Sequence, residues 1–543
     1  MKIVIAEKVA ANAVQVLKQE KEWTVVTHEQ LNGNLTNALS DADALIVRSA
    51  VDVNVKVLSA AERLRVIGRA GVGTDNIDLD AATKAGIAVM NTPGANAVAV
   101  AEHTLALMLS LSRHIPRADA TTKAGKWEKK SLQGTELHGK TLGIVGLGKI
   151  GMEVAMRAKA FQMKVVAHDP FVSTAVASKH AIELLELDDL YAAADYLTLH
   201  VAMTPQTARM INDQSLAKMK RGVRIINCAR GELIDDVALA AAITSKHVGG
   251  AALDVFTEEP PKNSPLVGLD NVIVTPHIAG STNEAQDAVG IQIASQVREY
   301  LKRGVVLNAV NMPSIGFEQY EEMQPYIALA RNLGVFLASG AYGRLEEIAI
   351  HYSGRIATWK TELIRNAAIQ GVLNQFAQEK ANLVNAAAIA REKGIQLFES
   401  GSERISGAGT SDVIKLTLKT SSNRRTVKGA VFNGTSLRLL SVDNIDIEVP
   451  LEGNLICLHN RDVPGVVGKV GSVLGQHEIN IGSFVLGRNG TNGHGAISVL
   501  QVDGCIADNI LHELLKVDEV RSIHSMCFHG PSIGAQPAVT PIM

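Results

Sequence analysis

The sequence predicts an α/β protein with two doubly wound parallel-sheet domains, followed by an α+β region and a small ferredoxin-like module. Three observations lead to this fold class. Short β-branched runs alternate with helical stretches over residues 1–90, which is the rhythm of βαβ units. A second series of the same kind begins at "KTLGIVGLGKIG". From residue 454 the pattern is strand, helix, strand, strand, helix, strand, which is the ferredoxin-like order.

The first parallel sheet is expected from two separate parts of the chain, residues 1–95 and 283–310. Its strands are the runs "KIVIAE", "ALIVRS", "RVIGRAG" and "IAVMN", and an amphipathic helix over 283–308 returns to it. The second sheet is expected over 96–282. A Pro-Gly break precedes a long Ala- and Leu-rich helix there, and the strands then run from "LGIVG" to "NVIVTPH".

The last part of the chain is expected to hold two further domains. Residues 311–450 mix two helical stretches with β-type runs such as "DVIKLTLKT", and no cluster of chemical residues stands out there. The ferredoxin-like module is expected over 451–528. The remaining residues, 529–543, are predicted to form a loose tail.

The bulk composition argues against several classes of partner. Of 543 residues, 53 are basic and 55 acidic, so neither nucleic acid nor a membrane surface is indicated. Four cysteines show neither metal-ligand spacing nor the density of a disulfide framework, so we expect reduced thiols and no metal. No signal peptide precedes the first strand, and no apolar run approaches the ~18 residues of a membrane span. We expect a cytoplasmic protein.

A glycine pattern in the second sheet indicates a nucleotide. The run "GLGKIG" places Gly146, Gly148 and Gly151 as G-x-G-x-x-G between an apolar strand and a helix. These glycines permit a tight turn, a close approach of the backbone to a pyrophosphate, and close packing of helix on strand. Asp169 follows at the end of the next strand, where it suits the ribose hydroxyls and repels a 2′-phosphate. The pattern predicts NAD; the alternative is a glycine-rich turn without a ligand.

Three polar residues fall where later strands of the second sheet end: Arg230, Glu259 and His277. Each has a structural alternative, namely an ion pair, an exposed loop acid and a histidine near a helix start. Together they suit hydride chemistry on a 2-hydroxy acid. The guanidinium binds a carboxylate bidentately, the histidine exchanges the hydroxyl proton, and the carboxylate fixes the histidine tautomer.

The runs "INCARGELID", "AALDVFTEEP" and "TPHIAGST", together with "GLGKIG", resemble the D-isomer-specific 2-hydroxyacid dehydrogenases. The resemblance implies that Arg230, Glu259 and His277 are catalytic. It also implies a flavodoxin-like substrate domain, a Rossmann domain, an intervening domain that is sometimes an effector site, and an ACT domain. Besides the three glycines, the implied NAD contacts are Lys149, Ile150, Asp169, Cys228, Ala229, Arg230, Asp254, His277, Ile278, Ala279 and Gly280.

The resemblance implies a substrate site and an effector site as well. Substrate contacts are expected at Val72, Gly73 and Asn96, and phosphate contacts at Arg48, Arg69 and Lys129, the last from a partner subunit. The alternative, that these cations are only surface charges, stays open. In the ACT domain the "RDVPG" turn and "EINI" place Asp462 and Asn480 at positions that contact serine.

The whole arrangement resembles long members of the family, which oxidise D-3-phosphoglycerate to 3-phosphohydroxypyruvate with NAD, the first step toward L-serine. Feedback inhibition by L-serine and a homotetramer are expected from the same resemblance. Two alternatives remain at this point. One is another D-2-hydroxyacid dehydrogenase, or a hydroxypyruvate or glyoxylate reductase; the other is a non-enzymatic NADH-sensing relative.

Overall fold

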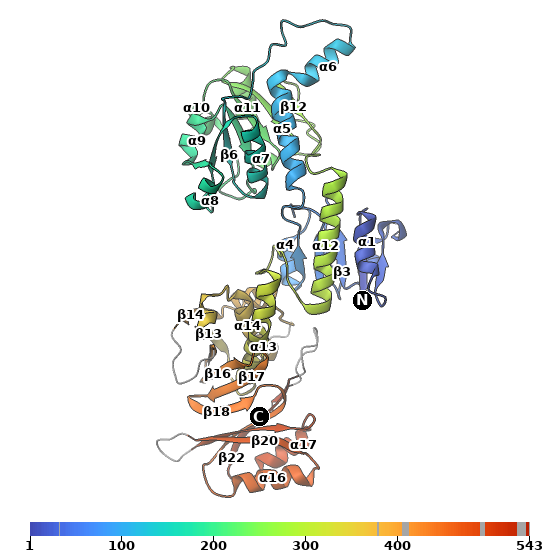
Figure 1. Ribbon diagram of the computed structural model, residues 1–543. Coiled ribbons are helices and arrows are strands. Elements are labelled where there is room, and N and C mark those ends of the chain that lie inside the picture. The colour runs from blue at the N-terminus through green and yellow to red at the C-terminus, as the bar shows by residue number, and fades with distance from the viewer. Residues whose placement is uncertain (32, 377–379, 404–411, 489–494, 529–538, 542–543) are drawn as a thin grey trace. The chain divides into compact units, whose positions relative to one another are not determined.

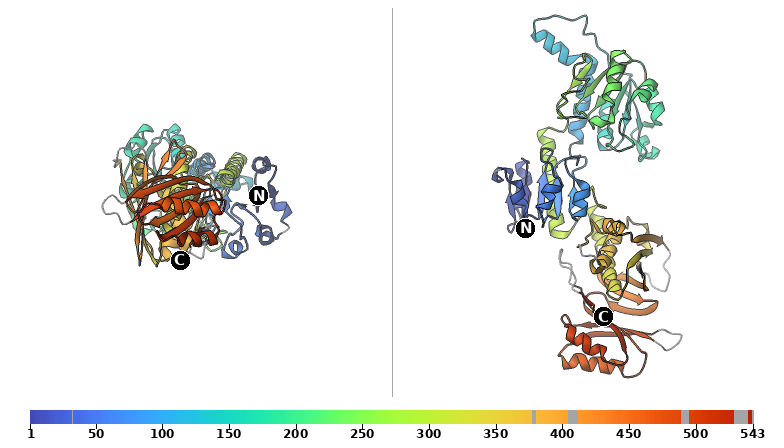
Figure 2. Two further views of the ribbon diagram at one scale, coloured as in Figure 1. Left: turned by 90° about the horizontal axis from the view of Figure 1, so that it is seen from below. Right: turned by 180° about the vertical axis from the view of Figure 1, so that it is seen from behind.

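The structure is a computed structural model and describes residues 1–31, 33–376, 380–403, 412–488, 495–528 and 539–541 (Figures 1 and 2). The chain divides into two compact units. Unit 1 comprises Met1–Lys8, Val14–Asn91 and Ile293–Met543, and unit 2 comprises Val9–Ala13 and Thr92–Gln292. None of the described helices is both long enough and apolar enough to cross a membrane.

Unit 1 begins with a five-stranded sheet in which all strands are parallel. The strand order is β2-β1-β3-β4-β5, which is the flavodoxin-like order and confirms a doubly wound domain. The strands are β1 (Lys2–Ile5), β2 (Thr24–Val26), β3 (Ala44–Val47), β4 (Val66–Arg69) and β5 (Ala88–Met90). The helices are α1 (Ala11–Lys18), η1 (His28–Gln30), α2 (Leu35–Leu39), α3 (Val55–Ser59), α4 (Leu79–Lys84) and the end of α12 (Asn283–Arg303).

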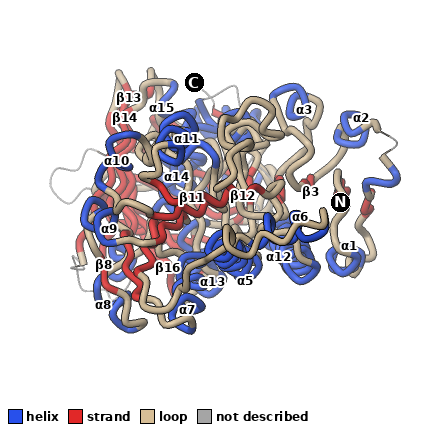
Figure 3. The backbone as a smooth tube through the Cα atoms, turned by 90° about the horizontal axis from the view of Figure 1, so that it is seen from above, coloured by secondary structure: helices blue, strands red, loops and turns tan. Residues whose placement is uncertain are grey.

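Unit 2 is built around a seven-stranded parallel sheet, part of which Figure 3 shows at β11 and β12. Its order is β12-β11-β10-β9-β6-β7-β8, so the winding reverses between β6 and β9, where such sheets bind ligands. The strands are β6 (Thr141–Val145), β7 (Lys164–His168), β8 (Glu183–Leu184), β9 (Tyr196–Leu199), β10 (Val223–Asn227), β11 (Val248–Leu253) and β12 (Val272–Val274). The helices are α5 (Ala97–Arg113), α6 (Ile115–Lys123), α7 (Lys149–Ala160), α8 (Thr174–Lys179), α9 (Leu187–Ala193), α10 (Asp213–Lys218), η2 (Gly231–Leu233) and α11 (Asp236–Thr244).

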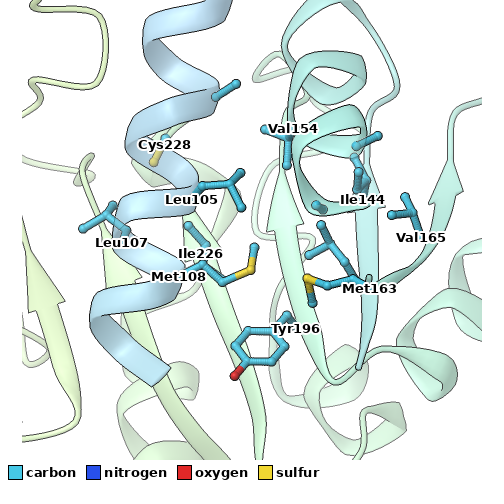
Figure 4. Packing of buried hydrophobic residues seen from close by; sticks show 14 of the residues in the cluster. Leu105, Leu107, Met108, Ile144, Val154, Met163, Val165, Tyr196, Ile226 and Cys228 are labelled. Carbon is cyan, nitrogen blue, oxygen red and sulfur yellow. The ribbon is translucent and has the colours of Figure 1, made fainter. Parts of the chain in front are cut away.

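One face of this second sheet is covered by α5 and α7 (Figure 4). Leu105 and Met108 of α5 pack with Val154 of α7 against strand residues such as Tyr196 and Ile226, all of them buried. Each such side chain contributes ~1.5–3 kcal/mol by its burial. The strands are apolar on both faces because helices cover both, which is why their sequences form continuous hydrophobic runs.

A third sheet follows in unit 1, with order β14-β13-β15-β16-β17-β18. Only β13 and β14 are parallel neighbours; the others are antiparallel. The expectation of two helical stretches is corrected, because a third, short helix lies in the Ala-rich run before β14. The elements are α13 (Phe317–Ser339), β13 (Leu345–Ser353), η3 (Arg355–Thr358), α14 (Glu362–Phe376), α15 (Ala386–Glu392), β14 (Gln396–Ser402), β15 (Val413–Thr420), β16 (Arg424–Phe432), β17 (Ser436–Val442) and β18 (Ile445–Pro450).

The fourth sheet is antiparallel, with order β20-β21-β19-β22-β23. The elements are β19 (Gly453–Asn460), α16 (Val466–Gln476), β20 (Ile481–Arg488), β21 (Ala496–Val502), α17 (Asp508–Leu515), β22 (Val520–Phe528) and β23 (Val539–Pro541). The first six give the expected β-α-β-β-α-β order, and both helices pack on one face (Figures 1 and 2). The expected loose tail is corrected at β23, whose backbone pairs with β22; the rest of the tail lies outside the described residues.

Candidate active site

The turn between β6 and α7 has the geometry of a phosphate-binding loop. Gly146 has φ +92°, and a Cβ there would lie 2.5 Å from the carbonyl oxygen of His200. A Cβ at Gly151 would lie 2.1 Å from the carbonyl oxygen of Gly146, so helix and turn are in direct contact. Gly148, the residue before α7, faces open space. A ligand phosphate can therefore approach the backbone at the helix N-terminus, so the turn fits NAD.

Asp169 lies beside this turn, directly after β7. Its Oδ2 accepts a hydrogen bond of 2.8 Å from the backbone N–H of Leu147, and its Oδ1 one of 2.8 Å from that of Phe171. Each oxygen keeps a lone pair for a ribose hydroxyl. Lys149 donates to the carbonyl oxygen of Pro93 at 3.0 Å, and Ile150 packs against the core.

The segment after β10 holds Arg230 in a tight turn. Buried Asn227 accepts from the N–H of Ala229 at 3.0 Å and donates to the carbonyl oxygen of Arg230 at 2.8 Å. A Cβ at Gly231 would lie 2.0 Å from the carbonyl carbon of Phe256, so only glycine fits there. The guanidinium itself donates to the carbonyl oxygen of Ala229 at 2.7 Å and is half-buried. The guanidinium therefore stays at the sheet edge.

Cys228, next to Arg230, is a buried thiol. Burial raises its pKa to about 12. The thiol therefore stays protonated at neutral pH and is a poor nucleophile.

Glu259 and His277 form the central pair of the site. Oε2 of Glu259 lies 2.8 Å from Nδ1 of His277, and Oε1 accepts from the N–H of Phe256 at 3.1 Å. The two side chains remain 40% and 51% exposed. With Nδ1 at the carboxylate, Nε2 is the ring nitrogen that can exchange a proton with a substrate. His277 has φ +53°, so the imidazole is held on a left-handed turn.

Asp254 holds the loop that carries His277. Its carboxylate is fully buried and accepts from the N–H groups of Ile278 at 2.9 Å and Ala279 at 2.8 Å, and from the hydroxyl of Thr275 at 2.5 Å. Burial alone raises its pKa, but these bonds and the neighbouring His103 outweigh it, so the pKa lies below the usual range. The stability that this ionised group contributes is present above the ordinary carboxyl pKa and is lost as the pH falls below it.

His103, which the sequence does not point to, and Asn96, which is expected as a substrate contact, both lie beside this loop. His103 on α5 places Nε2 3.1 Å from the Thr275 hydroxyl and 3.5 Å from Asp254. Asn96 precedes α5, and its Nδ2 would lie 2.9 Å from a Cβ at Gly280. His103 and Thr275 are 172 positions apart, and only the fold brings them together.

In unit 1, Arg48 and Arg69 lie at the ends of neighbouring strands, with Arg69 paired to the last residue of β3. Glu7, also missed in the sequence, accepts from the N–H of Arg48 at 2.8 Å and of Val51 at 3.2 Å. The sequence position of Glu7 could have identified it, because Glu7 directly follows the first strand and so lies at the same sheet edge. The Arg48 guanidinium contacts the carbonyl oxygen of Lys8 at 3.3 Å, and that of Arg69 contacts Ala70 at 3.2 Å.

The other expected contacts lie in loops. Val72 and Gly73 follow β4, and Val72 accepts from Asn91 Nδ2 at 2.6 Å. Lys129 lies in unit 2 in an exposed segment beside Trp127, whose side chain is 84% exposed.

The expected effector residues lie in the fourth sheet's module. Asp462 follows β19, and its Oδ1 lies 3.3 Å from Nε of Arg488. Asn480 precedes β20 and donates to Asp503 at 3.0 Å. Both predicted residues therefore have partners of their own within the module.

Comparisons with known proteins agree with this geometry. Residues 105–279 match the family "D-isomer specific 2-hydroxyacid dehydrogenase, NAD binding domain", and residues 322–443 match "D-3-phosphoglycerate dehydrogenase intervening domain". Fold and site together define an NAD-binding 2-hydroxyacid dehydrogenase.

The relatives identify the family within this class. D-3-phosphoglycerate dehydrogenase of Synechocystis sp. is 40% identical, covering 97% of this chain and 94% of that one. The enzyme of that name from Methanocaldococcus jannaschii is 39% identical, covering 96% and 99%. D-Lactate dehydrogenase of Aquifex aeolicus, solved with NAD and lactic acid, is 30% identical over 58% of this chain and all of that one, with a TM-score of 0.51. The chain belongs to the D-3-phosphoglycerate dehydrogenase family, which confirms the resemblance.

Proposed function

We propose that the protein oxidises D-3-phosphoglycerate to 3-phosphohydroxypyruvate with NAD, the first step of phosphorylated L-serine biosynthesis. The observation that carries the proposal is the Glu259–His277 pair at 2.8 Å on the sheet edge that also carries Arg230 and the glycine turn. The names of the relatives, which match nearly full length, support this choice of substrate.

In this proposal, Arg230 binds the substrate's carboxylate and C2 oxygen, because its planar fork suits two oxygens at once. His277 accepts the hydroxyl proton at Nε2, while Glu259 holds Nδ1–H and stabilises the imidazolium that forms. The glycine turn, Asp169 and the 277–280 loop would hold NAD, and its nicotinamide ring would supply the acceptor for the C2 hydride.

We assign the phosphate to Arg48 and Arg69, with Lys129 contributed by a partner subunit and backbone N–H groups at Val72 and Gly73 for the carboxylate. Two charge-assisted bonds to a phosphate contribute ~3–6 kcal/mol. This favours a phosphorylated substrate over its unphosphorylated analogue by roughly a hundredfold or more.

We propose four functional parts with the boundaries expected from the sequence, the last being an ACT module that binds L-serine at Asp462 and Asn480. A homotetramer is proposed with it. The four cysteines are unpaired thiols, which suits the cytoplasm as location.

The test follows NADH oxidation with 3-phosphohydroxypyruvate and with hydroxypyruvate, each with and without L-serine. A strong preference for the phosphorylated substrate, with inhibition by serine, is the expected result. Equal rates would overturn the phosphate assignment, and no oxidation of either would overturn the enzymatic role.

A further inference from the structure

Two of the four cysteines lie close together in the fourth sheet's module, and the proposed reaction uses neither. Cys505 is exposed, in the irregular segment between β21 and α17. Cys527 is buried near the end of β22. The other two, Cys228 and Cys457, are both buried.

Asn454 on β19 contacts Cys505 and stands opposite Cys527 in the sheet. Cys505 Sγ lies 3.4 Å from Asn454 Oδ1. Asn454 is also the register partner of Cys527 across the antiparallel β19–β22 pair. Side chains of such partners lie on the same face of the sheet, with Cβ atoms ~4.5–5.5 Å apart. Cys505 and Cys527 therefore both lie beside Asn454.

The surroundings give the two thiols different reactivities. Burial first, and then the neighbouring Cys505 thiol, raise the pKa of Cys527. Cys527 is thus held as a thiol away from solvent, whereas Cys505 is open to a reagent. The Cys505 segment is set by Gly504, with φ +82°, and anchored by buried Ile506, so Cys505 stays beside the sheet.

We propose that Cys505 and Cys527 form a redox modification site, which a small disulfide such as oxidised glutathione converts into an intramolecular disulfide. The Cys505 thiolate attacks one sulfur of oxidised glutathione, the glutathione S–S bond breaks, and one glutathione thiolate leaves. The Cys527 sulfur then attacks the Cys505 sulfur of the mixed disulfide, the bond to glutathione breaks, and the Cys527 proton passes to the departing glutathione thiolate. Two electrons pass from the cysteines to glutathione, and two glutathione thiols form after protonation.

The site lies next to a residue of the proposed effector site. Asp503, two residues before Cys505, accepts from Asn480 Nδ2 at 3.0 Å and donates its own N–H to the Asn480 carbonyl oxygen at 3.1 Å. A disulfide between Cys505 and Cys527 on β22 would restrict the movement of the segment that contains Asp503. Formation of the disulfide does not depend on the proposed function. Only an effect of the disulfide on the response to serine rests on that proposal.

The experiment incubates the full-length protein with oxidised glutathione at mildly alkaline pH, alkylates the remaining thiols and maps tryptic peptides by mass spectrometry. Cys457, Cys505 and Cys527 fall in different tryptic peptides, 439–461, 489–516 and 522–543. The expected product links the second and third peptides with the loss of two hydrogen atoms, migrates as a single chain on a non-reducing gel, and is reversed by dithiothreitol.

Variants separate the site from general oxidation. Cys505→Ser should leave Cys527 alkylatable only after denaturation, and Cys457→Ser should form the linked peptides as the parent does. A stable glutathione adduct on Cys505 that Cys527 never resolves would overturn the proposal. So would a link that forms only between chains.

Discussion

At the residue scale, His277 is the group whose replacement separates proton transfer from cofactor binding. His277→Asn keeps the size of the side chain but removes the base, so kcat should fall by roughly a hundred- to ten-thousandfold. NADH affinity should remain nearly unchanged, since Asp254 holds the 277–280 loop through backbone N–H groups of its neighbours. Stopped-flow turnover and fluorescence titration of NADH measure the two effects.

His180→Asn, an exposed histidine elsewhere in unit 2, is the matched control and should behave as the parent. Loss of NADH binding in His277→Asn, with His180→Asn normal, would contradict the proposed role of His277.

Arg230→Lys tests the geometry of the guanidinium rather than its charge. One N–H of Arg230 already bonds to the Ala229 carbonyl oxygen, and an ammonium group cannot keep that bond and also present a fork. The loss of a charged hydrogen bond, ~1.5–3 kcal/mol, should lower kcat/KM by roughly ten- to two-hundredfold. A rate within twofold of the parent would mean that Arg230 does not bind the reacting oxygens. Arg221→Lys, on the surface of the same unit, serves as control.

At the scale of elements, the β6–α7 turn separates cofactor binding from folding. Gly148→Ala adds a methyl group in open space at an ordinary φ of −73°, so the unfolding midpoint should not move. The methyl occupies the approach to the helix N-terminus, so the NADH dissociation constant should rise about tenfold or more, a loss of ~1.4 kcal/mol.

Gly151→Ala is the contrasting variant of the same turn. Its Cβ would lie 2.1 Å from a backbone oxygen, so the chain must shift and stability should fall by ~1–3 kcal/mol. Gly268→Ala, in open space away from the turn, should change neither the stability nor the NADH dissociation constant. Thermal unfolding with NADH titration distinguishes the three, and destabilisation by Gly148→Ala would refute the assignment of that space to a ligand.

The helices and strands also show which parts of the structure can be predicted from sequence patterns. Both parallel sheets and the β-α-β-β-α-β order were predictable, because hydrophobic periodicity is local. Helix α15, only seven residues long, was missed, because so short a run has too few turns for a periodic pattern. The sequence predicts Asp254 as a cofactor contact, and this stays a prediction; what the sequence does not reveal is that the same carboxylate holds the loop that carries His277. Those contacts join residues 21 to 25 positions apart, and no pattern of neighbours in the sequence encodes them.

At the scale of the whole molecule, catalysis and regulation are assigned to different parts of the chain. A substitution in the effector site should therefore change regulation without changing catalysis. Asp462→Ala removes an ion pair between the partly buried Asp462 and the exposed Arg488, which costs ~1 kcal/mol. Turnover without effector should be unchanged, and inhibition by L-serine should disappear. Initial rates across a serine titration check this, with the exposed Asp518→Ala as control. Inhibition that survives the change would place the effector elsewhere.

The pairing of β23 with β22 has a practical consequence for handling this protein. The backbone of Val539–Pro541 lies along His524–Met526, so a strand that would otherwise end the sheet is covered on that side. A chain cut after Phe528 would leave the outer N–H and C=O groups of β22 unpaired, and open strand edges invite edge-to-edge association between molecules. Trimming these last residues to aid crystallisation is therefore expected to promote aggregation instead.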